Sequence, residues 1–260
     1  MKIAVCIKPV PDPERYNDLK IDPEKGTLIR EGIPNVINES DLHALEEALK
    51  IKDNENVEVV VFAMAPESAK PQLRNALGLG ADKAVLISDR AVGGSDTLAT
   101  SQVLAKAIET TDTFDLILCG NESADGSTSH VPTQLAEWLN IPHSVNIVKI
   151  ENISEDTLNV NRKFEDGIGR YRMSLPCVVA VSTRINNVRY MTPMGIQKSF
   201  KKPLTVMCVD DIKDLDRNLI GLDGSPTQGG GLQEADYSRK VEMISGEPEE
   251  IAKKIVSLVR

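Results

Sequence analysis

The sequence lacks the features of a membrane protein or a nucleic-acid-binding protein. No stretch reaches the roughly 20 apolar residues that a membrane-spanning helix needs, so we expect no membrane insertion. Lys and Arg together number 30 against 39 Asp and Glu, which gives a formal net charge of −9. This acidic excess argues against a nucleic-acid partner, because phosphate backbones are bound by surplus cations.

The chain is also poor in cysteine and histidine. Its four cysteines have no C-x-x-C spacing, and each lies in an apolar run. We therefore expect buried, reduced thiols in a cytoplasmic protein rather than disulfides or metal ligands. The three histidines are too widely separated for a local metal motif, and no nucleophile elbow is present, so the sequence indicates no catalytic residue. The cysteines are Cys6, Cys119, Cys177 and Cys208, and the histidines are His43, His130 and His143.

Two common nucleotide-binding motifs are missing as well. No G-x-G-x-x-G follows the first apolar run, Ile3–Ile7, and the chain has no P-loop. We expect that run to be a strand rather than a signal peptide, and it leads into the proline-rich segment Lys8–Pro13. A nucleotide site would therefore have to use the carboxyl ends of several strands.

What the sequence does contain is an alternation of short apolar runs and helical patterns over its first two-thirds. This alternation predicts an α/β fold with a doubly wound, mainly parallel sheet, Rossmann-like and similar to that of adenine-nucleotide hydrolases. Nearly continuous apolar runs such as Val57–Phe62 are typical of strands covered on both faces. The expected strands are residues 3–7, 57–62, 84–87, 116–119 and 145–150; the expected helices are 40–52 (with Ser40 as N-cap), 67–79, 96–110 and 133–139.

The pattern changes after about residue 150. Leu158–Lys163 and Gly169–Ser174 predict an antiparallel hairpin, an addition at about 157–175 to a nucleotide-binding domain of residues 1–220, and Cys177–Val181 predicts a further strand. Residues 221–233 contain five glycines and lead to a last predicted helix, 247–259. We expect 221–260 to form an extended C-terminal arm that packs on a partner subunit.

A loop rich in hydroxyls and glycines lies between the expected strand 116–119 and the expected helix 133–139. Backbone N–H groups and the helix dipole at such a place attract a phosphate, so we predict a nucleotide phosphate here, with a solvated N-cap loop as an equal alternative. Cys6, at the end of the first strand, and Met64, just past the second, are candidates for contact with an adenine, although core packing is the favoured interpretation of both. The loop residues are Gly120, Asn121, Glu122, Ser123, Ala124, Asp125, Gly126, Ser127, Thr128, Ser129, His130 and Val131.

A second candidate surface is the segment 190–200, an irregular stretch of apolar residues flanked by lysines. A methionine anchor within a rim of charge suits a transient interface, so we predict that it docks a partner protein. The alternative is that Met194 and Ile196 fill the core of the domain. The residues concerned are Tyr190, Met191, Pro193, Met194, Ile196 and Lys198, with Lys201 and Lys202 beyond them.

Taken together, these segments resemble the small (beta) subunit of electron-transfer flavoproteins over residues 1 to about 227. No single segment is decisive, but their order and spacing make the set specific. The segments that carry the resemblance are Met1–Asp12, Ile21–Gly32, Leu45–Leu49, Gly78–Ala84, Val160–Gly167, Leu175–Val179, Ile185–Tyr190, Gly195–Ile196 and Gly224–Thr227.

The resemblance implies a heterodimer with a larger alpha subunit that carries most of an FAD site. It also implies a bound AMP in this subunit, or a second FAD in members that bifurcate electrons and oxidise NADH. The family's function is to pass electrons from a flavin dehydrogenase, typically of the acyl-CoA dehydrogenase type, to an acceptor. By position, the nucleotide would be held by Cys6, Asn38, Glu39, Ser40, Asp41, Met64 and residues 120–131.

The sequence departs from the family pattern at several of these positions. His130-Val131-Pro132 replaces the common glutamine- and glycine-containing turn, and Ser127 stands where bifurcating members often have a second Asp. Pro193 stands at the usual leucine of the partner-recognition segment. Two other function classes stay open. An adenine-nucleotide hydrolase would need a nucleophile or a pyrophosphate loop, which Lys8–Pro13 does not offer, and the C-terminal arm counts against a stand-alone nucleotide sensor.

Overall fold

The computed structural model describes residues 1–18, 20–21, 28–29, 32–227, 241 and 243–259. The chain divides into two compact units, Met1–Lys20 with Arg30–Gly230, and Ile21–Ile29 with Gly231–Arg260. In the described part of the chain, no helix is long and apolar enough to cross a membrane.

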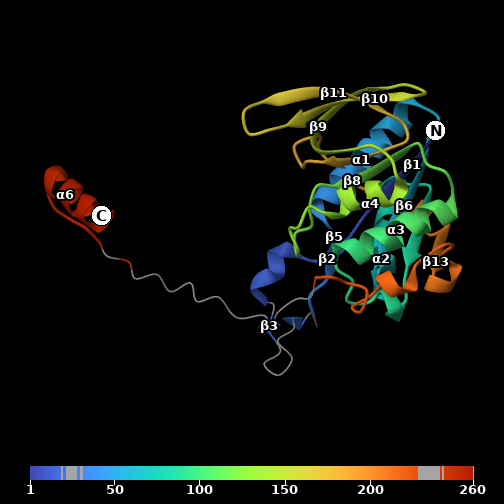
Figure 1. Ribbon diagram of the computed structural model, residues 1–260, viewed down its shortest axis with the longest axis horizontal. Helices are drawn as coiled ribbons and strands as arrows, with labels where there is room; N and C mark the ends of the chain where they lie inside the picture. Colours follow the sequence, from blue (N-terminus) through green and yellow to red (C-terminus); the bar gives the residue numbers. More distant parts are fainter. Residues whose placement is uncertain (19, 22–27, 30–31, 228–240, 242, 260) are drawn as a thin grey trace. The chain divides into compact units, whose positions relative to one another are not determined.

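The first unit is built on a nine-stranded sheet in the order β11-β10-β9-β12-β8-β1-β6-β7-β13 (Figure 1). The seven strands β9-β12-β8-β1-β6-β7-β13 pair in parallel with their neighbours. Strands β10 and β11 form an antiparallel hairpin that continues the sheet beyond β9. The predicted doubly wound sheet is confirmed. The strands are β1 (Lys2–Cys6), β6 (Glu58–Met64), β7 (Lys83–Ile87), β8 (Leu116–Gly120), β9 (His143–Ile153), β10 (Thr157–Lys163), β11 (Ile168–Ser174), β12 (Cys177–Val181) and β13 (Leu204–Met207).

Helices cover both faces of this sheet, as the alternating pattern predicted. They are α1 (Glu39–Asn54), α2 (Lys70–Leu79), α3 (Thr97–Thr111), α4 (Val131–Leu139) and α5 (Pro193–Ser199), and the short 3-10 helices are η1 (Pro13–Asp18), η2 (Glu67–Ala69), η3 (Arg90–Val92), η4 (Val209–Asp211) and η5 (Arg217–Leu219).

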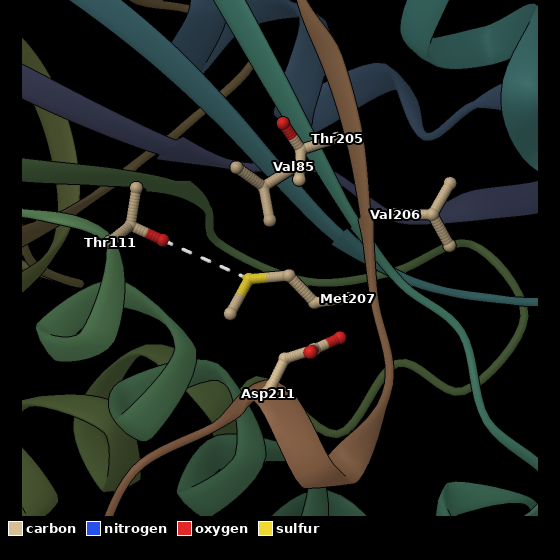
Figure 2. Close-up of a pocket in the computed structure, with 6 residues that line it drawn as sticks. All are labelled: Val85, Thr111, Thr205, Val206, Met207 and Asp211. Atoms are coloured by element: carbon tan, nitrogen blue, oxygen red, sulfur yellow. Dashed lines mark hydrogen bonds between the residues drawn. The ribbon is translucent and has the colours of Figure 1, made fainter.

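The edge strand β13 was not predicted from the sequence. It pairs with β7 and lines a surface cavity of about 380 Å³ together with Val85, Thr111 and Asp211 (Figure 2). The Thr111 hydroxyl faces the Met207 sulfur at 4.0 Å across this cavity. Only four residues long and half exposed, β13 lacks the continuous apolar run that identified the central strands.

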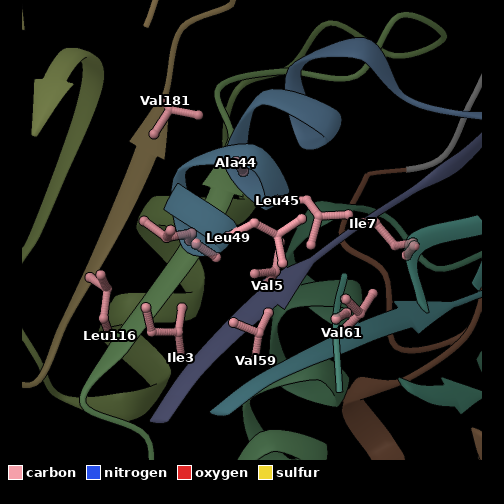
Figure 3. Packing of buried hydrophobic residues seen from close by; sticks show 14 of the residues in the cluster. Ile3, Val5, Ile7, Ala44, Leu45, Leu49, Val59, Val61, Leu116 and Val181 are labelled. Carbon is pink, nitrogen blue, oxygen red and sulfur yellow. The ribbon is translucent and has the colours of Figure 1, made fainter. Parts of the chain in front are cut away.

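The core consists of two clusters, one on each face of the sheet, because successive side chains of a strand point to opposite faces. On β1, Ile3 and Val5 face α1 and pack with Leu45 and Leu49, as Figure 3 shows. Ala4 and Cys6 face the other way, into the cluster that includes residues of α3 and α4. Both faces of β1 are therefore buried, which explains the nearly continuous apolar runs in the sequence.

Two local expectations need correction, and one segment has a structure that the sequence did not predict. Ser40 is not the N-cap of α1; the helix begins at Glu39 after Asn38, and Ser40 lies inside its first turn. The proline-rich segment after β1 contains strand β2 (Pro9–Pro11), which pairs with β5 (Asn35–Ile37) in a small antiparallel sheet. Part of the irregular segment 190–200 is helix α5, which starts with Thr192 as N-cap and Pro193 in its first turn, a sequence signal for a helix start.

Residues 220–227 are held against the start of α3. The Ser225 hydroxyl donates to the Gly221 carbonyl at 2.6 Å and accepts from the Asp96 N–H at 2.8 Å. The Thr227 N–H donates to the Asp96 carboxylate at 3.0 Å. These bonds fix the chain up to Thr227, whereas the rest of the predicted linker, 228–233, lies outside the described residues.

The second unit contains helix α6 (Pro248–Val259), at the place predicted for the last helix. Ile255, Val256 and Leu258 are exposed on it. A further pair of two-residue strands, β3 (Lys20–Ile21) and β4 (Leu28–Ile29), forms a two-stranded sheet.

Candidate functional site

The carboxyl ends of three neighbouring strands meet the start of helix α1. Cys6 ends β1, Met64 ends β6 and Gly120 ends β8, and these strands lie side by side in the order β8-β1-β6. Ligands of open α/β sheets bind beyond such strand ends. The candidate loop 120–131, called the nucleotide loop below, leaves the sheet at this edge.

Gly120 allows α1 to approach the end of β8 without a gap. A Cβ atom at this position would overlap the Asp41 and Ser40 side chains and would come within 2.7 Å of the Asp41 backbone nitrogen. No side chain larger than hydrogen fits this space unless the helix moves. The first turn of α1 is therefore fixed relative to the nucleotide loop.

Asp41 joins the ends of β1 and β8. Its carboxylate accepts the Lys8 N–H at 2.7 Å and the Gly120 N–H at 3.1 Å. Burial raises the pKa of this carboxyl to about 7, against the opposing effect of the hydrogen bonds from Lys8, Asn38 and Gly120. Asp41 thus positions backbone at the candidate site and does not itself face solvent.

Asn38 and Ser40 bind the nucleotide loop directly. The Asn38 amide and the Ser40 hydroxyl donate to the Glu122 carbonyl at 2.8 and 2.6 Å. The Ala124 N–H donates to the Asn38 side-chain oxygen at 3.0 Å. Both side chains are buried, whereas Glu39 between them is exposed. The sequence had grouped Asn38–Asp41 as ligand contacts, and three of these four side chains are used to hold the loop.

Lys8 spans the other side of the nucleotide loop. Its ammonium donates to the Ser123 hydroxyl at 3.2 Å and to the Asp125 carboxylate at 2.5 Å. Burial raises the pKa of Asp125, but the hydrogen bond and the charge of Lys8 outweigh it, so the pKa lies below its usual value. Lys8 is not among the site residues predicted from the sequence, although it directly follows the first expected strand.

The tip of the nucleotide loop has the geometry of an anion site. Ser127 and Ser129 have positive φ values of 46° and 57°, and the Ser127 N–H donates to the Ser123 carbonyl at 2.8 Å. The N–H groups of Gly126, Thr128 and Ser129 bind no acceptor in the part of the chain that the structure describes. These donors lie just before the start of α4, where the helix dipole also favours an anion. The residues present therefore fit a phosphate group.

The remaining loop residues are placed as follows. The Asn121 side chain accepts the Asn146 N–H at 3.1 Å, and the Ser129 hydroxyl donates to the Glu122 carboxylate at 3.3 Å. Thr128 and His130 are exposed, and Val131 opens α4. His130 makes no cap bond with its side chain. The cavity at β13 and a second cavity, of about 470 Å³, are not lined by any of these loop residues.

Cys6 and Met64 occupy the positions that core packing predicts for them. The Cys6 side chain is buried in the core cluster, and Met64 packs half-buried against it. The hydrogen bond with Cys6, together with burial, raises the pKa of the Cys119 thiol well above its usual value. Contact of Cys6 or Met64 with an adenine stays a prediction. All four cysteines are free and three are buried, but Cys208 is half-buried and its thiol donates to Asp211 at 3.2 Å.

The second candidate region presents apolar side chains outward. Tyr190 is 96% exposed, Met194 60%, Phe200 72% and Ile196 44%; these four residues are called the docking surface below. Pro193 and Lys198 are exposed beside them. The alternative that Met194 and Ile196 fill the core does not agree with these exposures. Met191 differs from its neighbours, because it is half-buried and its sulfur lies against Gly78 of α2.

The expected rim of exposed lysines is wrong at Lys202. Its ammonium is turned inward and donates to the carbonyls of Leu77 and Ala81 at 2.9 and 2.5 Å. Burial, together with the charge of Lys52, lowers its pKa. The lysine binds the last carbonyls of α2 and its turn, which leaves Lys198 and Lys201 as the exposed charges of this segment.

Sequence reasoning missed a buried polar cluster on α1. Glu46 and Glu47 are about 5% exposed, and they bind Arg189 and Asn186 from the segment after β12. His43 is a member of the same cluster, with its Nδ1 at 2.6 Å from the Asn186 side-chain oxygen. Two adjacent glutamates beside the apolar stripe of an expected helix were the available signal. Among the described residues, no group of three or more His, Cys, Asp or Glu side chains could hold a metal ion.

Comparison with known proteins agrees with the resemblance. The electron transfer flavoprotein domain model matches residues 25–212. The chain is 40% identical to an electron transfer flavoprotein subunit beta of Clostridium acetobutylicum over 260 residues, 100% of this chain and 98% of that one. It is 43% identical over 229 residues to the caffeyl-CoA reductase-Etf complex subunit CarD of Acetobacterium woodii, 88% and 86% of the two chains. It is 39% identical over 233 residues to the acryloyl-CoA reductase electron transfer subunit gamma of Anaerotignum propionicum, 87% and 86% of the two chains.

Proposed function

Because the chain belongs to the electron transfer flavoprotein family, as a beta subunit matched over its full length, we propose that it forms a heterodimer with a larger alpha subunit in the cytoplasm. In this complex it carries electrons between a flavin dehydrogenase of the acyl-CoA dehydrogenase type and an acceptor. The names of two relatives, a caffeyl-CoA reductase complex subunit and an acryloyl-CoA reductase subunit, support an acyl-CoA-type partner. The alpha subunit holds most of one FAD, and this chain completes that site.

The observation that carries the nucleotide assignment is the set of unbound N–H groups at the tip of the nucleotide loop. We infer that Gly126, Thr128 and Ser129 donate to the phosphate of an AMP or to the pyrophosphate of a second FAD. A bound flavin supplies the electron-transfer chemistry itself. This chain contributes binding and orientation, with Asn38, Ser40 and Asp41 fixing the backbone that meets the phosphate.

Ligand content tests this assignment. The complex of this chain with its alpha subunit is purified, and the ligands released on denaturation are identified by mass spectrometry. AMP with one FAD identifies a simple carrier, and two FAD identify the electron-bifurcating form that oxidises NADH. The Asp125-Gly126-Ser127-Thr128 segment resembles bifurcating members in its Asp-Gly and its Thr.

A paired variant locates the site. Ser127→Glu with Thr128→Glu places two carboxylates against the phosphate, so we expect loss of the AMP or of the second FAD and retention of the first. The matched control is Thr113→Glu with Ser174→Glu, two exposed hydroxyl residues outside the nucleotide loop, one just before β8 and the other at the end of β11. Full nucleotide content in the Ser127/Thr128 variant would exclude the nucleotide loop as the phosphate site.

We further propose that the docking surface binds the dehydrogenase. Large exposed apolar side chains are the residues that dominate interface energies, and Lys198 and Lys201 supply the charge that speeds encounter with an acidic partner. The C-terminal arm is assigned to the alpha subunit, because α6 carries exposed apolar side chains at Ile255, Val256 and Leu258.

A further inference from the structure

The docking surface is fixed from behind by one arginine. The Arg189 guanidinium donates to the Glu46 carboxylate through Nε at 2.8 Å and through Nη2 at 3.1 Å, and Nη2 also donates to the Asp53 carboxylate at 2.7 Å. The backbone N–H of Arg189 donates to Glu46 as well, at 3.2 Å. One residue before Tyr190, the chain is therefore bound by main chain and side chain to two turns of α1.

A close contact between two helices fixes the middle of the segment. A Cβ atom on Gly195 of α5 would overlap the Gly78 carbonyl of α2, and a Cβ atom on Gly78 would overlap the Met191 sulfur. The helices approach so closely because Gly195 lacks a side chain, and the absence of one at Gly78 leaves room for the Met191 sulfur. The backbone that carries Met194 and Ile196 is thus packed directly on α2.

The end of the segment is bound by a second arginine. Arg74 of α2 donates from one nitrogen to the Ser199 carbonyl at 2.6 Å and to the Lys202 carbonyl at 2.8 Å. Lys202 in turn donates to the carbonyls of Leu77 and Ala81. Charged side chains from both sides therefore hold residues 199–202, next to the exposed Phe200.

We propose that Arg189 is a positioning residue for partner docking, which holds Tyr190 and the rest of the docking surface in the bound conformation before the dehydrogenase arrives. The inference rests on the proposed docking function. A segment whose backbone is ordered in advance avoids the entropy cost of ordering at encounter, which for one or two residues is enough to change affinity about tenfold. Because the Arg189 guanidinium is bound to Glu46 and Asp53 of α1, its effect is on affinity and not on the electron-transfer step.

The experiment compares Arg189→Met and Arg189→Lys with Arg217→Met in the complete complex with the alpha subunit. Arg217 is the matched control, since its guanidinium pairs with the exposed Asp210 on another part of the chain. The probe is the fastest reductant found in a panel of purified acyl-CoA dehydrogenases. The KM of the dehydrogenase for the complex, kcat, nucleotide content and amide exchange of residues 190–200 are measured for each variant.

We expect Arg189→Met to raise KM about tenfold and to speed amide exchange of residues 190–200, with kcat and nucleotide content unchanged. Arg189→Lys keeps the charge but loses the fork of donors, so its KM lies between those of the wild type and of Arg189→Met. Arg217→Met changes none of the four quantities. If Arg189→Met does not fold, Asp53→Ala, which removes the exposed partner of the same guanidinium, gives a smaller rise in KM.

The outcomes separate the two proposals. If Tyr190→Ala with Met194→Ala leaves KM unchanged, the docking function itself is wrong. If that variant raises KM but Arg189→Met and Asp53→Ala do not, the docking function stands and the positioning role of Arg189 is overturned. Equal rises in KM for Arg189→Met and Arg217→Met would indicate a general charge effect and would also overturn it.

Discussion

The nucleotide loop and the docking surface are built in opposite ways. In the nucleotide loop the polar groups face inward: Asn38, Ser40 and Asp41 satisfy its backbone from behind, and unbound N–H groups are left at its tip. In the docking surface the apolar side chains face outward, and charged side chains such as Arg189 hold the backbone from below. The nucleotide loop exposes N–H groups, which a phosphate needs, and the docking surface exposes apolar side chains, which a protein partner needs.

This difference shows why each region tolerates a different kind of change. The nucleotide loop depends on close backbone approach, so a single added methyl group is harmful there. The docking surface depends on side chains that contact little of the chain itself, so truncating one of them affects binding and leaves the fold unchanged. The following changes test this contrast, beginning with the largest expected effect.

Gly120→Ala should be the most damaging single substitution. The added Cβ overlaps Asp41 and Ser40, so α1 or β8 must shift, at a cost of about 1–3 kcal/mol in the free energy of unfolding, with loss of bound nucleotide. Gly167→Ala is the control, because a Cβ at that hairpin-turn position meets no atom within 4 Å. Urea unfolding and ligand content measure both effects. Equal stability of the two variants would show that the close approach at Gly120 carries no strain.

Asp41→Asn should change how stability depends on pH. The carboxyl has a pKa of about 7 in the folded chain against a usual value of 3.8, so the folded state binds this proton more tightly than the unfolded state. The stability contributed by Asp41 is therefore full below pH 4 and is lost as the pH rises to 7, by at most about 1.4 kcal/mol per pH unit.

In the Asp41→Asn variant, the free energy of unfolding no longer falls with pH for this reason, because the amide does not titrate. The amide nitrogen of the new side chain also cannot accept a hydrogen bond, so one of the N–H groups of Lys8 and Gly120 loses its acceptor. The variant is therefore less stable than the wild type at pH 5, and the difference in the free energy of unfolding becomes smaller towards pH 7. Urea unfolding at pH 5, 6 and 7 measures the slope, and Glu39→Gln, an exposed carboxylate on the same turn, is the control. An unchanged slope in Asp41→Asn would show that Asp41 does not titrate in this range.

Met194→Ala should weaken docking without weakening the fold. Because Met194 is 60% exposed, its truncation leaves no cavity, and we expect a three- to tenfold rise in the KM for the dehydrogenase, about the effect of one interface anchor. Met191→Ala is the informative comparison, since the Met191 sulfur packs on Gly78 and its loss should lower the thermal midpoint. Loss of stability in Met194→Ala with normal KM would reverse the assignment.

Removal of residues 228–260 should affect the two regions least. The truncated chain keeps the Ser225–Asp96 bonds, so we expect the nine-stranded sheet, the nucleotide loop and the docking surface to stay folded. Association with the alpha subunit should weaken, because the exposed apolar residues of α6 are lost. Co-purification in rising salt measures the association. Full yield at every salt concentration would remove the arm from the interface.

The central sheet could be predicted because its information is local. Val57–Phe62 is a nearly continuous apolar run and Cys177–Val181 a continuous one, and each coincides with or overlaps a strand of the observed sheet. Thr192 and Pro193 were also local signals of a helix start, but the methionines around them suggested an irregular contact surface and the helix was missed.

The bonds that hold the candidate site could not be predicted in the same way, because they join residues far apart in the chain. The contact of Asp41 with Gly120 spans 79 positions, and that of Glu46 with Arg189 spans 143. The two adjacent glutamates beside the apolar stripe are a local signal of a polar cluster, but they do not identify Arg189 as the partner of Glu46. Lys202 shows the same limit: its position in a lysine pair predicted an exposed charge, and only the fold turns it onto the end of α2.

The contact between Gly78 and Gly195 shows that some positions of this segment must keep their residue, whereas others can change during evolution. Substitution of Gly195 pushes α5 off α2, because the added Cβ meets the Gly78 carbonyl, whereas Tyr190, Met194, Ile196 and Phe200 are exposed side chains that can be exchanged one at a time with the backbone left in place. If the docking surface binds the dehydrogenase as proposed, a few surface substitutions are enough to change which dehydrogenase it binds. Each of these single substitutions would leave the protein folded, because the exchanged side chains are exposed.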